Sequence, residues 1–234
     1  MSTAGTAVPV VTIDGPSGAG KGTVSRRLAE RLGWHYLDSG ALYRLVALAG
    51  LGQGLAASDR AGHERIAPRL DIRFGANPDG SELILLGGED VTASVRAEES
   101  GMGASRVAAW PELREALKAR QHAFAEPPGL VADGRDMGTV IFPAAPLKIY
   151  LSATAEERAL RRYNQLKGKD SGVSLAALSR EIATRDRQDA SRPVAPLVPA
   201  EDAVIVDSTQ LNVAEVVDRV WQLGAQRALW PWVR

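Results

Sequence analysis

The chain of 234 residues contains no cysteine, few aromatic residues (5%) and no excess charge of either sign, with 28 Lys and Arg against 28 Asp and Glu. The absence of cysteine excludes disulfide bonds, thiolate metal sites and thiol nucleophiles. Zero net charge and a shortage of aromatic stacking platforms argue against a nucleic-acid-binding protein. Because no apolar run approaches the roughly 20 residues that a membrane span needs, we also expect no membrane partner.

The N-terminus lacks the features of a secretory signal, because residues 1–6 contain neither a basic region nor an apolar core. Together with the missing cysteines, this favours a cytoplasmic protein. Hydrophobic residues make up 45% of the chain and charged residues 24%, which is ordinary globular composition. The length suits one α/β domain with an insertion, or two small domains.

A glycine-rich loop ending in Lys21 is the most informative segment. It follows a predicted buried strand from Val10 to Asp14 and precedes a predicted helix with Val24, Leu28 and Leu32 on one face. Glycines allow successive backbone N–H groups to point at an anion, and the helix N-terminus adds partial positive charge. The loop matches the pattern GxxxxGK, and its flanking elements disfavour the alternative of a turn with an incidental lysine.

The loop predicts a nucleoside triphosphate ligand, but it does not decide between a kinase, a GTPase, a motor and a nucleotide-gated switch. Gly22 stands where a serine or threonine usually follows the lysine, so we interpret Thr23 as the hydroxyl nearest Mg²⁺. The residues predicted to bind the triphosphate are Gly15, Pro16, Ser17, Gly18, Ala19, Gly20, Lys21, Gly22 and Thr23.

Short apolar segments separated by helical patterns predict an α/β fold, with a parallel sheet covered by helices on both faces. The expected strands are Val10 to Asp14, Trp34 to Asp38, Leu130 to Asp133, Leu147 to Leu151 and Val204 to Asp207. Four of them end in aspartate, at the edge of the sheet where ligands bind. Two capping boxes, Thr154 with Glu157 and Asn212 with Glu215, each predict the start of a helix.

One region interrupts this alternation of strands and helices. Residues 70–74, 82–86 and 87–91 form a predicted antiparallel meander, with a turn at 77–80. The meander is too short to form a core of its own. We therefore expect residues from about 65 to 105 to be an insertion that packs on the sheet and covers a substrate.

Two predicted helices each carry charged residues on one face. These residues are Arg158, Arg161 and Arg162 on the first helix, and Arg185, Asp189 and Arg192 on the second. On a solvated helix they would be surface decoration, but beside a phosphate loop they suit an arm that closes to exclude water. The run Gly168 to Gly172 joins the helices like the tip of a mobile hairpin. We expect an arginine-rich lid at about 158–192, within a single domain whose core covers about 8–64 and 106–228.

Two further clusters lie where a strand passes into the next segment. Asp133, opposite the phosphate loop, can hold Mg²⁺ through water, and Arg135 can grip a second phosphate. The alternative for this cluster is a turn in which Arg135 and Asp136 pair with each other. Ser39 is either an anion ligand or a helix N-cap, and Arg44 follows one turn later. A triphosphate loop with several separate arginines favours transfer between two phosphates over hydrolysis.

Four segments resemble bacterial cytidylate kinases, in the same order and spacing. They are residues 13–23, 37–44, 132–140 and 192–197. The resemblance implies a monomeric P-loop nucleoside monophosphate kinase with a five-stranded parallel sheet, a small inserted antiparallel β-domain over the acceptor site and a lid. It also implies in-line transfer of the γ-phosphate of ATP to CMP or dCMP with Mg²⁺.

The resemblance further implies roles for individual residues. The positions that read cytosine correspond to Ser105, Arg114 and Asp136. Those around the sugar correspond to Tyr43, Arg185 and Asp189. Acceptor-phosphate positions correspond to Arg44, Arg135 and Arg192, with Ser17 and Ser39 nearby. Donor-phosphate positions correspond to Lys21, Arg158 and Arg162, with Arg161 as a further candidate. We expect catalysis by Lys21, Arg158, Arg162 and Asp133, with Mg²⁺ at Thr23 and Asp133, partly through water.

Several alternatives stay open at this point. The same machinery would serve UMP or a small hydroxylated metabolite, and a P-loop module could sense ATP without transferring phosphate. The segment Asp186 to Gln188 departs from the acid- and arginine-rich pattern of the family, which leaves the lid contacts open. The tail from Leu229 to Val233 has no family counterpart, and its two tryptophans either cap the last helix against the sheet or form a contact surface.

Overall fold

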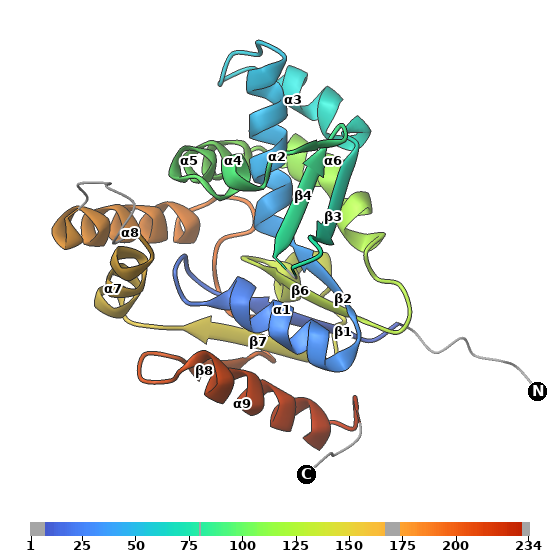
Figure 1. The fold of residues 1–234 in the computed structure, drawn as a ribbon, viewed down its shortest axis with the longest axis vertical. Coiled ribbons are helices and arrows are strands. Elements are labelled where there is room, and N and C mark those ends of the chain that lie inside the picture. The colour runs from blue at the N-terminus through green and yellow to red at the C-terminus, as the bar shows by residue number, and fades with distance from the viewer. Residues whose placement is uncertain (1–7, 80, 167–173, 231–234) are drawn as a thin grey trace, which may run out of the picture. The chain divides into compact units, whose positions relative to one another are not determined.

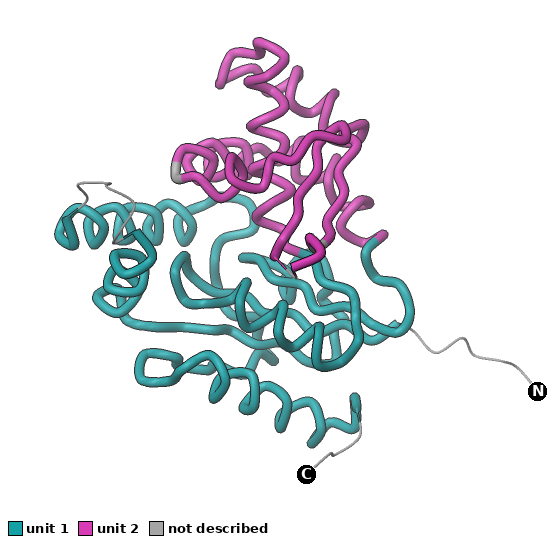
Figure 2. Tube along the Cα trace, viewed as in Figure 1, with its two compact units in different colours: residues 1–37, 124–234 teal, residues 38–123 magenta. Residues whose placement is uncertain are grey.

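The computed structural model describes residues 8–79, 81–166 and 174–230 (Figure 1). The predicted hairpin tip from Gly168 to Gly172 lies outside the described residues. The chain divides into two compact units, residues 1–37 with 124–234 and residues 38–123 (Figure 2). The predicted boundaries of the insertion and of the lid are a different division of the chain and stay predictions. Among the described residues, no helix combines the length and the apolar character that crossing a membrane requires.

The first unit is built on a five-stranded sheet with the strand order β2-β6-β1-β7-β8. Its strands are β1 (Val10–Asp14), β2 (His35–Asp38), β6 (Leu130–Gly134), β7 (Leu147–Ser152) and β8 (Val204–Asp207). The central strand β1 pairs in parallel with β6 and β7, and β7 pairs in parallel with β8. Every residue of β1 is buried, which explains its continuous apolar run. The predicted strands and the P-loop α/β fold class are confirmed.

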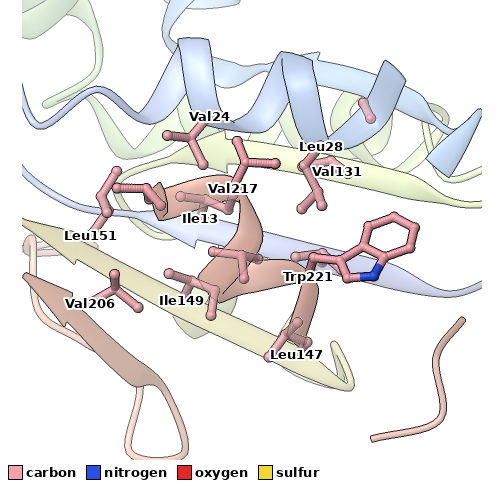
Figure 3. Packing of buried hydrophobic residues seen from close by; sticks show 14 of the residues in the cluster. Ile13, Val24, Leu28, Val131, Leu147, Ile149, Leu151, Val206, Val217 and Trp221 are labelled. Atoms are coloured by element: carbon pink, nitrogen blue, oxygen red, sulfur yellow. The ribbon is translucent and has the colours of Figure 1, made fainter. Parts of the chain in front are cut away.

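Two amphipathic helices, α1 (Lys21–Leu32) and α9 (Val213–Gln226), pack against each other and against the sheet. The core between them contains Val24 and Leu28 of α1, one helical turn apart, and Val217 of α9 (Figure 3). Helix α9 begins at the predicted capping box. The Asn212 side chain accepts from the backbone N–H of Glu215 at 3.1 Å, and the Glu215 carboxylate accepts from the N–H of Asn212 at 2.7 Å.

Tryptophan side chains also belong to this core. Trp230, which is 7% exposed, donates from Nε1 to the carbonyl of Trp221 at 3.0 Å. Its ring meets Trp34 edge to face, with 5.8 Å between the centroids. Of the two alternatives for the tail, the structure therefore supports packing against the last helix for Trp230, whereas Trp232 lies outside the described residues.

The two arginine-bearing helices are α7 (Ala155–Leu166) and α8 (Leu175–Ala190), which pack on each other. Ala159, Leu178 and Ile182 form their shared core. Helix α7 begins at Ala155 as predicted, and the Thr154 hydroxyl accepts from the N–H of Glu157 at 3.3 Å. Because α8 ends at Ala190, Arg192 lies beyond it, and the prediction that Arg192 shares a helical face with Arg185 is wrong.

The second unit, residues 38–123, contains the predicted meander. Strands β3 (Ile72–Ala76), β4 (Glu82–Leu86) and β5 (Glu89–Asp90) form an antiparallel sheet. The helices of this unit are α2 (Ser39–Gly52), α3 (Arg60–Ile66), the 3-10 turn η1 (Ala67–Arg69), α4 (Thr92–Arg96), α5 (Glu98–Val107) and α6 (Pro111–His122). A core of Ala41, Leu45, Ile84 and Val95 joins α2 and α4 to the sheet.

The sequence did not predict helices α4 and α5. Helix α5 contains Gly101 and Gly103, and two glycines lower helix propensity by about 1 kcal/mol each. Gly103 serves packing, because a Cβ at this position would lie 3.1 Å from the Cβ of Ala47 on α2. Tertiary contact with α2 therefore outweighs the weak local preference of the α5 sequence.

Candidate phosphate-binding site

The glycine-rich loop leaves the central strand β1 and opens helix α1. Gly18 and Gly20 have positive φ angles of 80° and 92°, which side chains rarely adopt. Gly20 is the N-cap of α1 and supplies no side-chain hydrogen bond, so the first N–H groups of the helix are available to an anion. Gly15 is required for a different reason, since a Cβ there would lie 2.0 Å from the carbonyl oxygen of Leu151 in β7.

Lys21 is buried at the base of this loop. Its Nζ donates to the carbonyl of Pro16 at 2.9 Å. Burial lowers the pKa of Lys21 to about 7, and the positive charge of Arg135 adds to the shift, against the opposing carboxylates of Asp133 and Asp14. Lys21 thus lies near other cationic side chains, and a bound anion would offset the repulsion between these positive charges.

A second group of cations lies in the same unit, around Asp189 on α8. Arg135 Nε donates to Asp189 Oδ2 at 2.8 Å, and Arg192 pairs with Asp189 Oδ1. Burial lowers the pKa of Arg185, and the neighbouring charges of Arg135 and Arg192 lower it further. In the described part of the chain, Arg185 Nε is buried without a hydrogen-bond partner. The buried carboxylate of Asp189 thus pairs with two arginines, and a third arginine lies beside them. This local excess of positive charge favours anion binding.

These contacts test the alternative in which Arg135 and Asp136 lie in a turn and pair only with each other. The ion pair with Asp189 joins Arg135 to α8, far along the chain. The segment that carries Arg135 and Asp136 is instead held by Asp14, whose two carboxylate oxygens accept the backbone N–H groups of Met137 and Gly138, each at 2.8 Å. Burial raises the pKa of Asp14 to about 6, although these two hydrogen bonds oppose the shift.

Asp133 ends strand β6 beside the first turn of α1. It is 6% exposed, and its Oδ2 accepts from the Tyr36 hydroxyl at 2.8 Å. A Cβ at Gly22 would lie 3.4 Å from the same oxygen, so position 22 faces Asp133. The Thr23 side chain is exposed and follows Gly22 around the helix. Asp133 therefore faces the first turn of α1, and the assignments of Asp133 and Thr23 to a bound cation both stay predictions.

Helix α7 contacts the phosphate loop through two arginines. Arg158 donates to the loop carbonyl of Ser17 at 3.0 Å and pairs with both carboxylate oxygens of Asp186, at 3.0 and 2.6 Å. Arg161 reaches the loop at the carbonyl of Ala19, at 3.5 Å, and also donates to the Glu157 carboxylate at 2.8 Å and to the Ser208 carbonyl at 2.5 Å. The side chain of Arg158 is almost completely buried, so it cannot be surface decoration.

The second unit carries the other predicted substrate residues. Asp38, rather than Ser39, caps α2: Asp38 Oδ1 accepts from the N–H of Ala41 at 2.9 Å, so the N-cap alternative for Ser39 is wrong. The Ser39 hydroxyl instead donates to Gln121 Oε1 at 2.9 Å. On α2, Tyr43 is buried, and the Arg114 guanidinium lies 5.7 Å from the centroid of its ring.

A family model described as cytidylate kinase matches residues 11–226 of the chain. The chain belongs to the cytidylate kinase family. It is 57% identical over 223 residues to a cytidylate kinase of Stutzerimonas stutzeri (strain A1501), covering 95% of this chain and 97% of the relative. It is also 57% identical over 213 residues to that of Pseudomonas fluorescens (strain Pf0-1), covering 91% and 93%. The predicted family and the prediction of a phosphotransferase are confirmed.

Among solved structures, a gluconokinase from Sinorhizobium meliloti 1021 aligns over 94% of both chains with a TM-score of 0.48 and 16% identity. The family assignment does not depend on this distant likeness.

The site residues predicted from the family resemblance divide between the two units. The unit of residues 1–37 and 124–234 contains the phosphate loop with Asp133, Arg135, Asp136, Arg158, Arg162, Arg185, Asp189 and Arg192. The unit of residues 38–123 contains Ser39, Tyr43, Arg44, Ser105 and Arg114. Sequence reasoning gave no role to Asp14, Tyr36 or Gln121. For Asp14 a signal existed, because an aspartate ends the central strand next to the loop.

Proposed function

We propose that the chain transfers the γ-phosphate of ATP to CMP or dCMP, giving ADP and CDP or dCDP. The observation that supports this proposal most directly is the presence of two separate groups of cations in one unit. One is the loop with Lys21 and the open N-terminus of α1, and the other consists of Arg135, Arg185 and Arg192 around one carboxylate. A hydrolase or a sensor of ATP needs only the first group, whereas phosphoryl transfer between nucleotides needs both.

The reaction moves the γ-phosphorus from the bridging oxygen of ATP to an oxygen of the acceptor phosphate. The loop N–H groups and Lys21 would hold the donor phosphates, and Arg135 with Arg192 would hold the acceptor phosphate. These cations offset the repulsion between the two anions and the charge on the equatorial oxygens. In-line transfer of this kind requires no general base, since positioning and charge supply the catalysis.

Base recognition is proposed for Asp136 together with Ser105 and Arg114. Cytosine offers an exocyclic amine as a donor beside two acceptors, which suits a carboxylate combined with a cation. Asp136 is buried and precedes the π-helical turn η2 (Met137–Ile141), whose first two N–H groups are fixed by Asp14. Tyr43, Arg185 and Asp189 are proposed to contact the sugar.

The residues present fit a bound Mg²⁺. Magnesium sites of this kind use one or two carboxylates, substrate phosphate oxygens and several waters, and the carboxylate of Asp133 lies beside the first turn of α1. When bound, the ion would neutralise negative charge on the donor phosphates. Asp133 would hold it through water, and Thr23 is the proposed second ligand. A cytoplasmic location and a monomeric state stay predictions.

A coupled assay of ADP release tests the proposed function. The protein is incubated with Mg-ATP and with CMP, dCMP, UMP, AMP or GMP in turn, and Lys21→Ala serves as the blank. We expect turnover with CMP and dCMP that is lost in the blank. Turnover with UMP alone would change the acceptor, and binding of ATP without turnover on any acceptor would favour a sensor.

Asp136→Ala tests the base-reading site separately. We expect a sharp loss of activity with CMP and unchanged binding of ATP, measured by calorimetry. Unchanged kinetics with CMP would contradict the assignment of Asp136 to base recognition.

A further inference from the structure

Arg96, the last residue of α4, lies between two carboxylates in the unit of residues 38–123. Its Nη1 donates to Asp38 Oδ2 at 2.7 Å, while Nε and Nη2 donate to the two oxygens of Glu82 at 2.8 and 2.6 Å. We propose that Arg96 is a positioning residue for the acceptor nucleotide, fixing the start of α2 against strand β4. The family resemblance assigns no role to this arginine.

Asp38 is the point where Arg96 reaches α2. One carboxylate oxygen of Asp38 caps the helix at the N–H of Ala41, and the other binds Arg96. Although burial alone would raise the pKa of Asp38, the Arg96 guanidinium holds the pKa below its usual value. Asp38 therefore stays ionised at neutral pH, and its orientation is fixed from both sides.

Glu82 is the point where Arg96 reaches the sheet. The two parallel hydrogen bonds form the bidentate fork that orients an arginine most strongly. Glu82 stands two residues before Ile84, which is fully buried in the core shared with α2. Arg96 thus connects the sheet to the N-terminal turn of α2 by ionic contacts at the edge of an apolar core.

Arg44 provides a second connection between α2 and α4, which runs from α2 to the residues on either side of Arg96. Its Nη1 donates to the carbonyls of Val95 and Ala97, at 2.8 and 3.1 Å, on either side of Arg96. A shift of Arg96 would therefore move Arg44 as well as the first turn of α2. Because Arg44 is assigned to the acceptor phosphate and Ser39 to its vicinity, this inference rests on the proposed function.

The opposing interpretation is that Arg96 itself binds the acceptor phosphate. However, the Nε, Nη1 and Nη2 atoms of its guanidinium already donate to two carboxylates, which compete with a phosphate for these donors. The two interpretations predict opposite effects for Glu82→Gln. If Arg96 binds the phosphate, freeing it from Glu82 would strengthen acceptor binding. If Arg96 instead positions α2, losing its contact with Glu82 would weaken acceptor binding.

Steady-state kinetics on the full chain test the proposal with Arg96→Ala, Arg96→Lys and Glu82→Gln. We expect Arg96→Ala to raise KM for CMP by at least about tenfold and to change KM for ATP by less than about twofold. Lysine supplies one point charge in place of a fork, so Arg96→Lys should fall between the wild type and Arg96→Ala. Glu82→Gln should raise KM for CMP.

Arg73→Ala is the matched control, because Arg73 lies on β3 of the same sheet and its ion pair with Asp71 is solvent-exposed. It should leave both KM values unchanged. An unchanged KM for CMP in Arg96→Ala, or a lowered KM in Glu82→Gln, would overturn the proposal. A loss of kcat at constant KM would also overturn it, since that result means only a smaller folded fraction.

Hydrogen exchange of the free protein separates this inference from the proposed function. Arg96→Lys should speed exchange of the backbone amides at residues 41–44, in the first turns of α2, relative to Arg73→Ala, whatever the acceptor is. Faster exchange without turnover on CMP would refute the proposed function and keep the link between Arg96 and α2. Unchanged exchange would refute the link itself.

Discussion

Trp230 packs against α9 at Gly224. We predict that Gly224→Ala destabilises the wild type but stabilises a variant that lacks the Trp230 side chain. A Cβ at Gly224 would lie 1.8 Å from Cζ2 of the Trp230 ring, far inside contact distance. Gly224→Ala must therefore displace the indole or shift the helix. Trp230 also loses its hydrogen bond to the Trp221 carbonyl if it leaves this position.

Two opposing contributions set the size of the effect. Replacing glycine by alanine within a helix gains about 1 kcal/mol, and removing a buried tryptophan costs about 3 to 5 kcal/mol. We therefore expect Gly224→Ala to lower the free energy of unfolding by about 2 to 4 kcal/mol. In a Trp230→Ala background the added methyl group enters vacated space, and the same substitution should stabilise by up to about 1 kcal/mol.

Urea unfolding of the wild type, the two single variants and the double variant measures this cycle. Far-UV circular dichroism is the appropriate signal, because tryptophan fluorescence changes with the mutation itself. Equal destabilisation by Gly224→Ala in both backgrounds would refute the reasoning, since it would mean that Trp230 is not what the methyl group meets.

The remaining predictions concern the strand end and the loop. Since burial raises the pKa of Asp14 to about 6, stability from its protonation is fully present below about pH 4 and is lost as pH rises through about 6. The wild type should therefore lose roughly 3 kcal/mol more than Asp14→Asn between pH 4 and pH 7, and parallel curves in urea unfolding would contradict this. Gly15→Ala should abolish ATP binding in calorimetry, because its Cβ meets the Leu151 carbonyl at 2.0 Å. Gly33→Ala, at another positive φ but with nothing within 4 Å of the added Cβ, should cost only about 1 kcal/mol and leave ATP binding unchanged.

The sheet and the phosphate loop could be predicted from the sequence because their signals are local. A strand buried on both faces must be apolar throughout, as β1 is, and a loop that cradles phosphate must contain glycines followed by a lysine. The start of α9 was equally predictable, because both halves of its capping box lie within four residues.

Contacts between distant residues could not be predicted in this way. Arg158 pairs with Asp186, 28 positions later, and Arg96 with Asp38, 58 positions earlier. Their partners depend on how helices pack, and an isolated charged side chain gives no indication of this. The mistaken N-cap role of Ser39 had a different cause, since aspartate and serine are both good caps and stand side by side.

The contact between α7 and the phosphate loop has a thermodynamic consequence. Arg158 joins Ser17 of the loop to Asp186 of α8, and the Cβ of Arg158 would lie 3.1 Å from a Cβ at Gly18. Any ligand in the loop that attracts this guanidinium competes with the Ser17 carbonyl and the Asp186 carboxylate. Occupancy of the loop and the population of helix-pair conformations are then linked variables, so a mutation on α8 should change nucleotide affinity by shifting an equilibrium instead of deleting a contact.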